Sequence, residues 1–356
     1  MRRLLCTTLL FSAGLAHAEV PRVATDIAPV HSLVSMVMQG AGSPDLIIPP
    51  GASPHSYAMR PTEARNLAQA DLVVWVGPSL TAWLKGPLDS LPQDAQRLTL
   101  QDADGIRLLT NRSGVAFEAH DHGDEAGHED HDGHDDHDDH DDHEDHDDHE
   151  DHEGHDHSGD DHGDEKDHAD HEATDAHEGH DHAAGALDPH MWLDPQNAIV
   201  WLDQIAAMLS QQDPENATLY SGNAEKAQAR LTDLQSDLQA ELAPLAGQKF
   251  IVFHDAYHYF EARFGVEASA SISLSDGAAP SAARLAEVRD VVKESQAACV
   301  FTEPQFNAGL IEALQDGAPL KSASLDPIGA QLAPGVEMYP SLLRDLSGAF
   351  TACLAN

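Results

Sequence analysis

The sequence predicts an α/β protein with two lobes, each built on a mostly parallel sheet flanked by helices, joined by one long rigid helix. Three observations support this fold class. Apolar strand patterns alternate with amphipathic helix patterns in two separate stretches, which is typical of parallel sheets. A single long amphipathic pattern at residues 213–244 lies between them. Residues 120–182 have the composition of a disordered insertion.

The first 18 residues have the features of a secretory signal peptide. Arg2 and Arg3 precede an apolar run, and Ala16 and Ala18 form an Ala-x-Ala cleavage site before Glu19. The apolar run is too short to span a bilayer. We therefore expect an exported protein that does not insert directly into a membrane.

Residues 19–212 are predicted to form the N-terminal lobe. The continuous apolar run at 72–76 is typical of a buried parallel strand. Asp194 and Pro195 supply an N-cap and a first-turn proline for a helix. We expect strands at 23–26, 45–48 and 72–76, and helices at 30–38, at 61–70 and from residue 195.

The stretch at residues 120–182 interrupts this lobe. It contains 19 histidines and 30 acidic residues, and Lys166 is its only basic residue. Fixing one residue costs about 1 to 2 kcal/mol of conformational entropy, and apolar burial is not available to offset that cost. A histidine at every third position fits neither a helix face nor a strand face. The segment is therefore predicted to be disordered.

The chemistry of this insertion indicates metal binding. Imidazoles and carboxylates together suit zinc, copper, nickel or manganese. A solvated polyanion that keeps the protein soluble is the alternative, but Asp and Glu alone would serve that purpose. The predicted accessory metal-capture residues are the nine that repeat at intervals of three: His131, His134, His137, His140, His143, His146, His149, His152 and His155.

Residues 213–244 are predicted to form the linking helix. Apolar residues recur every three or four positions from Tyr220 to Leu242, and the pattern ends before Pro244. At 1.5 Å per residue, thirty residues would reach about 45 Å, which is longer than most domains need internally. We interpret the helix as a rigid strut between the lobes.

Residues 245–356 are predicted to form the C-terminal lobe. The expected strands lie at 250–253, 299–302 and 322–325, and the expected helices lie around 256–264, from 280, at 310–314 and from 340. The lobe also contains Cys299 and Cys353, an even count that in an exported protein favours a disulfide. Such a bond would close a loop of about 55 residues and stabilise the fold by roughly 4 kcal/mol. Two free thiols acting as zinc ligands are the weaker alternative.

The composition also excludes some partners. The formal net charge is −43 at pH 7. A strongly negative chain without basic clusters is a poor ligand for nucleic acid or for anionic membranes.

Five histidines lie outside the signal peptide and the insertion, and three of them are placed like ligands. His55 follows a predicted strand, His254 ends another, and His190 lies just after the insertion. In open α/β sheets, ligands bind beyond the carboxyl ends of the strands. His31 and His258 lie within amphipathic helices, and we interpret them as helix-surface or packing residues.

Five motifs in order along the mature chain make it closely resemble the ZnuA-type periplasmic zinc-binding proteins of ABC importers. The motifs are GASPHSY at 51–57, ADLVVWVG at 70–77, DPHMW at 188–192, FHDAY at 253–257 and EPQF at 303–306. The resemblance implies two α/β lobes joined by a long helix, with one Zn²⁺ bound between them, and a His-rich insertion before the second ligand. It also implies a Cys299–Cys353 disulfide.

By that resemblance the zinc ligands are His55, His190 and His254, with Asp326 or water as the fourth ligand. Histidine at position 254, where manganese-binding relatives usually have Glu, favours zinc. Three imidazoles and one oxygen complete the tetrahedron that Zn²⁺ prefers. The implied protein is a periplasmic monomer without enzymatic activity that delivers zinc to the inner-membrane permease of an ABC importer and so serves zinc homeostasis.

Two other functions fit the same residues. An exported zinc or manganese buffer or metallochaperone would use the insertion as its main site. A zinc hydrolase would use three histidines and an open position to generate a zinc-bound hydroxide.

Overall fold

The computed structural model describes residues 20–91, 94–112, 114, 116–117, 185–273, 281–304 and 320–355. The predicted signal peptide, the His-rich insertion and the expected helix at 310–314 lie outside these residues. Among the described helices, none is both long and apolar enough to cross a membrane.

The first sheet has four parallel strands in the order β2-β1-β3-β4. They are β1 (Val23–Thr25), β2 (Asp45–Leu46), β3 (Leu72–Trp75) and β4 (Gln96–Thr99). Every residue of β3 is buried, as its apolar run predicts. Strand β4 was not among the predicted strands, because this edge strand is half exposed and contains a single large apolar residue, Leu98.

Four helices accompany this sheet: α1 (Ala28–Val37), α2 (Pro61–Ala68), α3 (Pro78–Thr81) and α4 (Lys85–Ser90). Prolines occupy the first turns of α1, α2 and α3, where the missing N–H removes no helical hydrogen bond. In α2 the Glu63 carboxylate also accepts a bond of 2.6 Å from the backbone N–H of Arg60, which satisfies a donor at the helix start. All residues of α1 are buried, so this helix lies within the core.

The second sheet also has four parallel strands, in the order β6-β5-β7-β8. They are β5 (Lys249–His254), β6 (Glu267–Ser273), β7 (Cys299–Thr302) and β8 (Lys321–Ser324), and the accompanying helices are α7 (His258–Phe264), α8 (Ala282–Ser295) and α10 (Met338–Leu354). Strand β6 was not among the predicted strands. It consists mainly of alternating Ala and Ser, and it has few of the β-branched and aromatic residues that are typical of strands.

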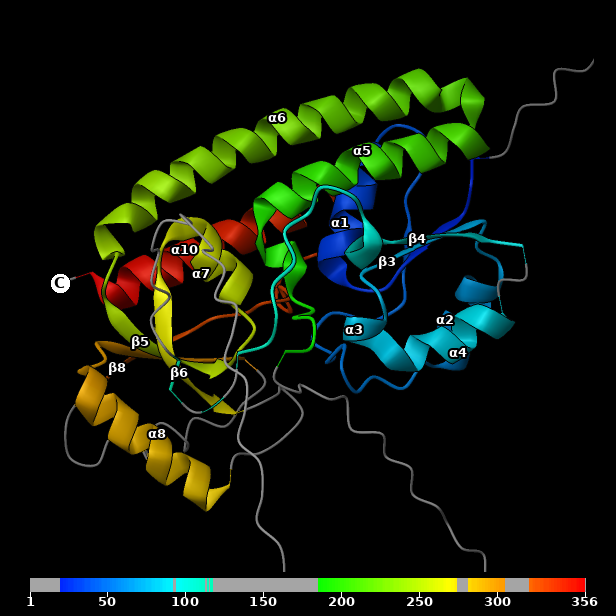
Figure 1. The fold of residues 1–356 in the computed structure, drawn as a ribbon. Helices are drawn as coiled ribbons and strands as arrows, with labels where there is room; N and C mark the ends of the chain where they lie inside the picture. The colour runs from blue at the N-terminus through cyan, green and yellow to red at the C-terminus, as the bar shows by residue number, and fades with distance from the viewer. Residues whose placement is uncertain are drawn as a thin grey trace, which may run out of the picture. The chain divides into compact units, whose positions relative to one another are not determined.

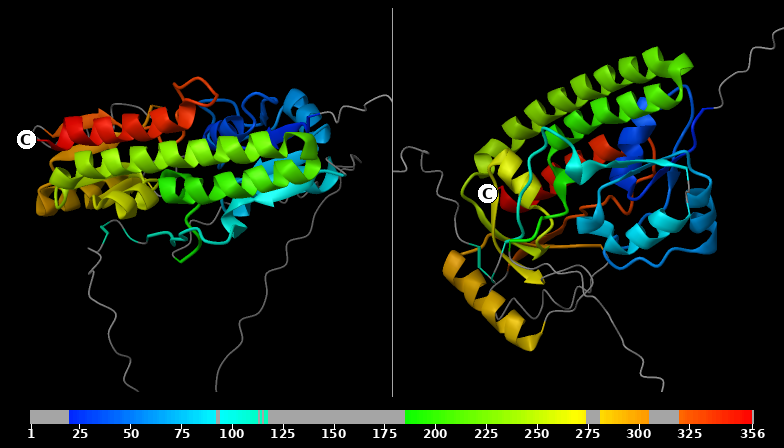
Figure 2. Two further views of the ribbon diagram at one scale, coloured as in Figure 1. Left: turned by 90° about the horizontal axis from the view of Figure 1, so that it is seen from above. Right: turned by 45° about the vertical axis from the view of Figure 1, so that its right-hand side comes forward.

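The two sheets lie under a shared layer of helices. Helices α5 (Pro195–Gln212) and α6 (Ala217–Leu242) pack together along their lengths (Figure 1). Viewed from above, α10 lies beside α6 (Figure 2). Helix α6 contacts α1 of the first sheet and α7 and α10 of the second. It therefore spans both halves, as predicted for the linking helix.

The linking helix differs from the prediction in length and setting. It has 26 residues, about 39 Å at 1.5 Å per residue, because 3-10 turns at Pro214–Asn216 and Ala243–Leu245 flank it. Its apolar stripe, which includes Leu231 and Leu238, is buried. The helix is thus one side of a packed helical layer and not an isolated strut.

One continuous apolar core extends from the first sheet, through the helices, to the second sheet. Side chains from the first sheet, from α5 and α6, and from one face of β5, such as Phe250 and Val252, belong to the same buried cluster. The opposite face of β5 contributes Ile251 and Phe253 to a smaller cluster under α8. This division follows the two-residue alternation of a strand. The shared core ties the two sheets together.

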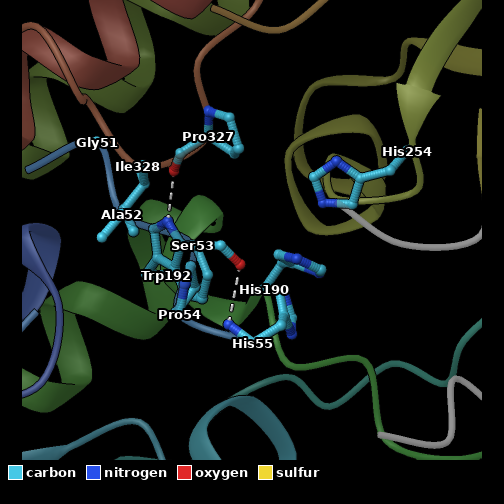
Figure 3. Close-up of a pocket in the computed structure, with 10 residues that line it drawn as sticks. All are labelled: Gly51, Ala52, Ser53, Pro54, His55, His190, Trp192, His254, Pro327 and Ile328. Carbon is cyan, nitrogen blue, oxygen red and sulfur yellow. Dashed lines mark hydrogen bonds between the residues drawn. The ribbon is translucent and has the colours of Figure 1, made fainter. Parts of the chain in front are cut away.

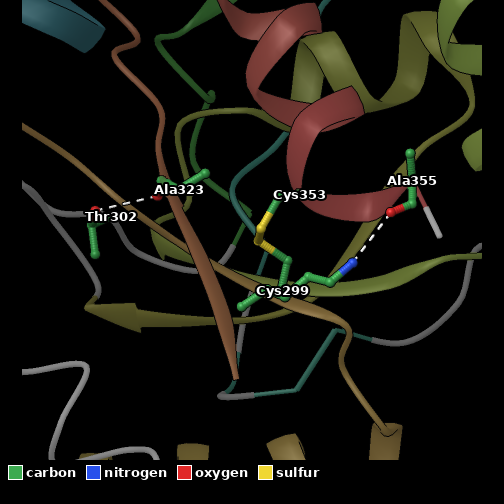
Figure 4. The surroundings of a disulfide bond; sticks show 6 residues. Cys299, Thr302, Ala323, Cys353 and Ala355 are labelled. Atoms are coloured by element: carbon green, nitrogen blue, oxygen red, sulfur yellow. Dashed lines mark hydrogen bonds between the residues drawn. A yellow bond between two sulfur atoms is a disulfide. The ribbon is translucent and has the colours of Figure 1, made fainter. Parts of the chain in front are cut away.

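The predicted disulfide is present between Cys299 and Cys353 (Figure 4). It joins β7 to α10, with a Cα–Cα distance of 5.9 Å. Because the two sulfurs are bonded to each other, the alternative of free thiols as zinc ligands is wrong.

The described segments on either side of the insertion pair with each other. Thr110 and Leu187 form an antiparallel bridge. The backbone N–H of Asn111 donates to the Ala186 carbonyl at 2.8 Å, and that of Asp188 donates to the Leu109 carbonyl at 2.9 Å. We call residues 109–111 and 186–188 the stem. The stem ends two residues before His190.

A buried carboxylate joins two strands of the first sheet. Asp26 is fully buried, and its two oxygens accept bonds of 2.8 Å from the backbone N–H groups of Ile27 and Val76. Burial raises the pKa of Asp26 to about 7, although these bonds act in the opposite direction. The folded state therefore holds the Asp26 proton more tightly than the unfolded chain does.

Replacing Cys353 with Ser should lower the free energy of unfolding by roughly 4 kcal/mol, because the unfolded chain regains the freedom that a cross-link over 54 positions removes. Urea unfolding followed by circular dichroism measures the change. The wild type unfolded under reducing conditions serves as the control and should match the variant. Equal midpoints for the oxidised wild type and the variant would contradict the prediction.

Replacing Asp26 with Asn should flatten the dependence of stability on pH. A raised pKa in the folded state stabilises the fold fully below pH 3.8, and this contribution disappears as pH rises towards 7. The change is on the order of 4 kcal/mol. Urea unfolding of both proteins at several values between pH 4 and 8 gives the two slopes. Identical slopes would rule out Asp26 as the titrating group.

Candidate metal centre

Three of the predicted site residues meet where the strands of both sheets end. His55 lies in the loop after β2, His190 follows the stem, and His254 is the last residue of β5. Their ligand atoms all lie within 4.8 Å of one another, and the side chains converge as Figure 3 shows. All three are at most 5% exposed. The structure thus brings together residues that are far apart in the sequence.

The loop that carries His55 is shaped by its prolines and one glycine. Gly51 has a φ of +83°, which residues with a side chain rarely adopt, in a turn where the Ala52 N–H donates to the Pro49 carbonyl. Trp83 donates from its indole N–H to the Pro54 carbonyl at 2.9 Å. This contact with the 3-10 turn at Ala82–Leu84, which follows α3, fixes the loop just before His55.

His190 is oriented by the acidic residue two positions before it. The Asp188 Oδ1 atom lies 2.9 Å from the backbone N and 2.8 Å from the ring Nδ1 of His190. Burial tends to raise the pKa of Asp188, but bonds to His190 and His258 outweigh it and lower the pKa to about 2. The ionised carboxylate can only accept, so the His190 Nδ1 carries the proton and Nε2 remains available for a metal.

His254 is oriented by a carboxylate that follows the neighbouring strand, β7. Its Nδ1 bonds to the carboxylate of Glu303, which follows β7. The Tyr257 hydroxyl donates to the same Glu303 oxygen at 3.3 Å. Burial, and then the charge of Glu303, raise the pKa of Tyr257 well above its usual value, so this hydroxyl stays a donor.

Asp326, the predicted alternative to water as fourth ligand, makes bonds within its own loop. Its Oδ1 accepts from the backbone N–H groups of Ile328 and Gly329 at 3.1 and 2.8 Å, and its Oδ2 accepts from Ala330 at 2.6 Å. The group of converging ligand atoms among the described residues consists of the three histidines. The ligand role of Asp326 stays a prediction, and its visible role is to shape the loop.

Pockets adjoin the histidines on two sides. One is lined by His55, Trp192, Pro327 and Ile328 among others, and Trp192 closes part of it by donating to the Pro327 carbonyl at 2.8 Å (Figure 3). The other is lined by Arg112, Asp255 and Phe117 among others. Both are also lined by His190 and His254, so these rings separate the two pockets.

Arg112, the residue directly after the first stem segment, ties this part of the chain to the second sheet. Its guanidinium bonds to Asp255, next to His254, and to Glu261 of α7, and it lies 3.9 Å from the centre of the Phe117 ring. The backbone N–H of Phe117 donates to Ser269 of β6. This ion-pair cluster was not predicted from the sequence. Arg112 lies more than 140 positions from both Asp255 and Glu261, and Glu261 belongs to an ordinary helix pattern.

The two histidines assigned to packing are both buried. His31 bonds through Nε2 to the Pro44 carbonyl at 3.1 Å, which fits the packing interpretation. His258 lies with its Nδ1 3.6 Å from the Asp188 carboxylate. His258 therefore belongs to the surroundings of His190, which its place in a helix did not reveal.

A family model described as zinc-uptake complex component A, periplasmic, matches residues 23–353. The chain belongs to this family. Its members are solute-binding proteins for zinc uptake and not enzymes, so the hydrolase alternative is wrong.

Curated relatives and solved structures agree with that assignment. The chain is 41% identical over 346 residues to a high-affinity zinc uptake system protein of Brucella suis, covering 97% of this chain and 95% of the relative. It is 43% identical over 340 residues to the corresponding protein of Paracoccus denitrificans, covering 95% and 93%. A crystal structure of ZnuA has the same fold, with a TM-score of 0.66, 20% identity, and coverage of 95% of this chain and 100% of that one.

Replacing Arg112 with Met should destabilise the fold by about 3 to 5 kcal/mol, because the buried carboxylate of Glu261 and the half-buried carboxylate of Asp255 lose their counter-charge. Thermal and urea unfolding of the zinc-free protein measures the loss. Arg230→Met is the matched control: it breaks an exposed pair with Glu337 and should cost about 1 kcal/mol or less. Equal losses in the two variants would contradict the interpretation of Arg112 as a buried tie.

Proposed function

We propose that this protein captures Zn²⁺ between its two sheets through His55, His190 and His254 and delivers it to the inner-membrane permease of an ABC importer. The observation that carries the proposal is the convergence of three buried imidazoles, from three loops, with ligand atoms within 4.8 Å of one another. Family membership supports the role in zinc uptake. The periplasm is the proposed location, and the proposed state is a monomer.

The ligand set favours zinc. Solved neighbours of the same fold include a Pseudomonas aeruginosa binding protein in complex with Mn²⁺ and the same protein with Ni²⁺, so the fold alone does not select the metal. Three neutral imidazoles with one remaining position form a good zinc site, whereas manganese prefers carboxylate and carbonyl oxygens. Water is the simpler fourth ligand, because the converging ligand atoms of the described residues come from the three histidines and Asp326 is not in that group.

Metal release is proposed to occur through the loops and not through a wide opening of the lobes. The core is continuous under both sheets, and α10 packs on α1 as well as on α6. A hinge motion would have to break this packing. The loops of His55 and Asp326 are anchored by the hydrogen bonds that Trp83 and Trp192 donate, and breaking these bonds costs less than separating the shared core.

The His-rich insertion is proposed to act as an accessory trap for zinc. The nine histidines from His131 to His155 lie outside the described residues, and His190 follows the insertion closely in the sequence, which supports this proposal. Weak tethered ligands raise the local metal concentration next to a stronger site. In the competing buffer hypothesis the insertion is the main site, so deleting residues 120–182 would remove nearly all zinc binding.

Replacing His55, His190 or His254 with Ala should lower the zinc affinity of the tightest site. The loss should exceed the roughly 10- to 100-fold that is typical when a hydrogen-bond partner of a metal ligand is removed. Competition with a chelator of known affinity, at less than one zinc per protein, measures this site in the full chain. His31→Ala is the matched control, since it removes a buried histidine elsewhere. The same measurement on the 120–182 deletion should retain one tight site.

Unchanged tight binding in any one of the three variants would refute that residue as a ligand. Loss of tight binding in the deletion would favour the buffer. The variant Asp326→Ala separates the two candidates for the fourth ligand, since a water ligand predicts little change in affinity.

A further inference from the structure

Two carboxylates are buried directly behind the proposed ligands. The side chains of Asp188 and Glu303 are 1% and 0% exposed, and each bonds to the Nδ1 atom of one histidine. The three imidazoles that would hold a zinc ion carry no charge. Placing a divalent cation in a buried site without nearby negative charge is very costly.

The geometry fixes how each carboxylate acts. One oxygen of Asp188 accepts both from the backbone N–H and from the ring of His190. These two bonds fix the orientation of the His190 ring relative to its own backbone. One oxygen of Glu303 bonds to His254 and accepts from Tyr257. In both pairs the Nδ1 atom is occupied, and Nε2 is the atom left to face a metal.

The start of α7 supports both carboxylates at once. Three consecutive residues reach them: Tyr257 bonds to Glu303, the His258 ring lies 3.6 Å from the Asp188 carboxylate, and Tyr259 donates to the Asp188 carbonyl at 3.2 Å. The Tyr259 hydroxyl also accepts from the Leu109 N–H of the stem at 2.8 Å. One helical turn thus sets the positions of two residues that act on different ligands.

We propose that Asp188 and Glu303 are positioning residues of the zinc site: each holds a ligand imidazole with Nδ1 protonated and Nε2 towards the ion, and together they offset its two positive charges. The inference rests on the proposed function. Hydrogen bonding to a carboxylate also makes the imidazole a stronger electron donor, and loss of such a partner typically lowers metal affinity by about 10- to 100-fold.

Amide and apolar variants separate charge from orientation. Glu303→Gln keeps an acceptor for the His254 ring but removes the charge, whereas Glu303→Met removes both. In Asp188→Asn the backbone N–H of His190 holds the amide oxygen in place of Oδ1, so orientation is kept there too. We expect zinc affinity to fall by about 10-fold for each amide variant and by about 100-fold for Glu303→Met.

The matched control is Asp213→Asn. Asp213 is also a buried carboxylate, but it accepts bonds from Asn216 and Tyr220 at the start of α6. Chelator competition gives the zinc affinity, and thermal unfolding without metal gives the stability of each variant. The control should lose stability and keep its zinc affinity, whereas Glu303→Gln should lose affinity without losing stability in the zinc-free state.

The outcomes distinguish this inference from the proposed function. If the wild type lacks a tight zinc site, the proposed function fails. If the wild type binds tightly and Glu303→Gln and Glu303→Met both match it, the inference is overturned for Glu303. A loss of affinity that is equal in Gln and Met would leave charge as the whole effect and overturn the orienting role. Should Asp188→Asn fail to fold, the Glu303 series alone decides.

Discussion

The joining of two sheets by one apolar core is the constraint on which the metal centre depends. A site made of three loops keeps its geometry only if the strands beneath those loops keep their separation. Helix α6 packs on helices of both sheets, and α10 packs on α1, where Ser32 accepts from the Tyr339 N–H and donates to the Gly335 carbonyl. The Tyr339 hydroxyl then donates to the Trp192 carbonyl, two residues from His190. Apolar packing and the polar site are therefore directly connected.

The polar residues around the three histidines supply the hydrogen bonds that buried imidazoles require. Imidazoles buried beside one another need hydrogen-bond partners, and each partner must leave one nitrogen exposed to the metal. Asp188 meets this need for His190, and Glu303 meets it for His254. Because both depend on the first turn of α7, the ligands from different loops share one support. Such shared support makes the site precise without a preformed charged ligand.

Much of this could be predicted from the sequence, and what could not has physical reasons. The alternation of elements, the linking helix and the three histidines carry local patterns or family motifs. Strands β4 and β6 carry none, because a half-exposed edge and an Ala/Ser-rich strand obtain their structure from their neighbours. Asp188 lies in the DPH motif, so a local signal existed. Glu303 lies 49 positions from His254, and only the pairing of β5 with β7 brings the two together.

The stem has a consequence for how the chain tolerates change. Its antiparallel bonds close the loop between residues 111 and 186 inside the folded scaffold. For a flexible loop, each doubling of length adds only about 0.6 kcal/mol of closure entropy. Arg112 and Phe117 must stay, because they hold this part of the chain to the second sheet. By the same rule, a change in chain length between Phe117 and Gly185 costs little. In protein-engineering terms the stem is a permissive insertion point, where a reporter domain could be placed beside the metal centre without rebuilding the fold.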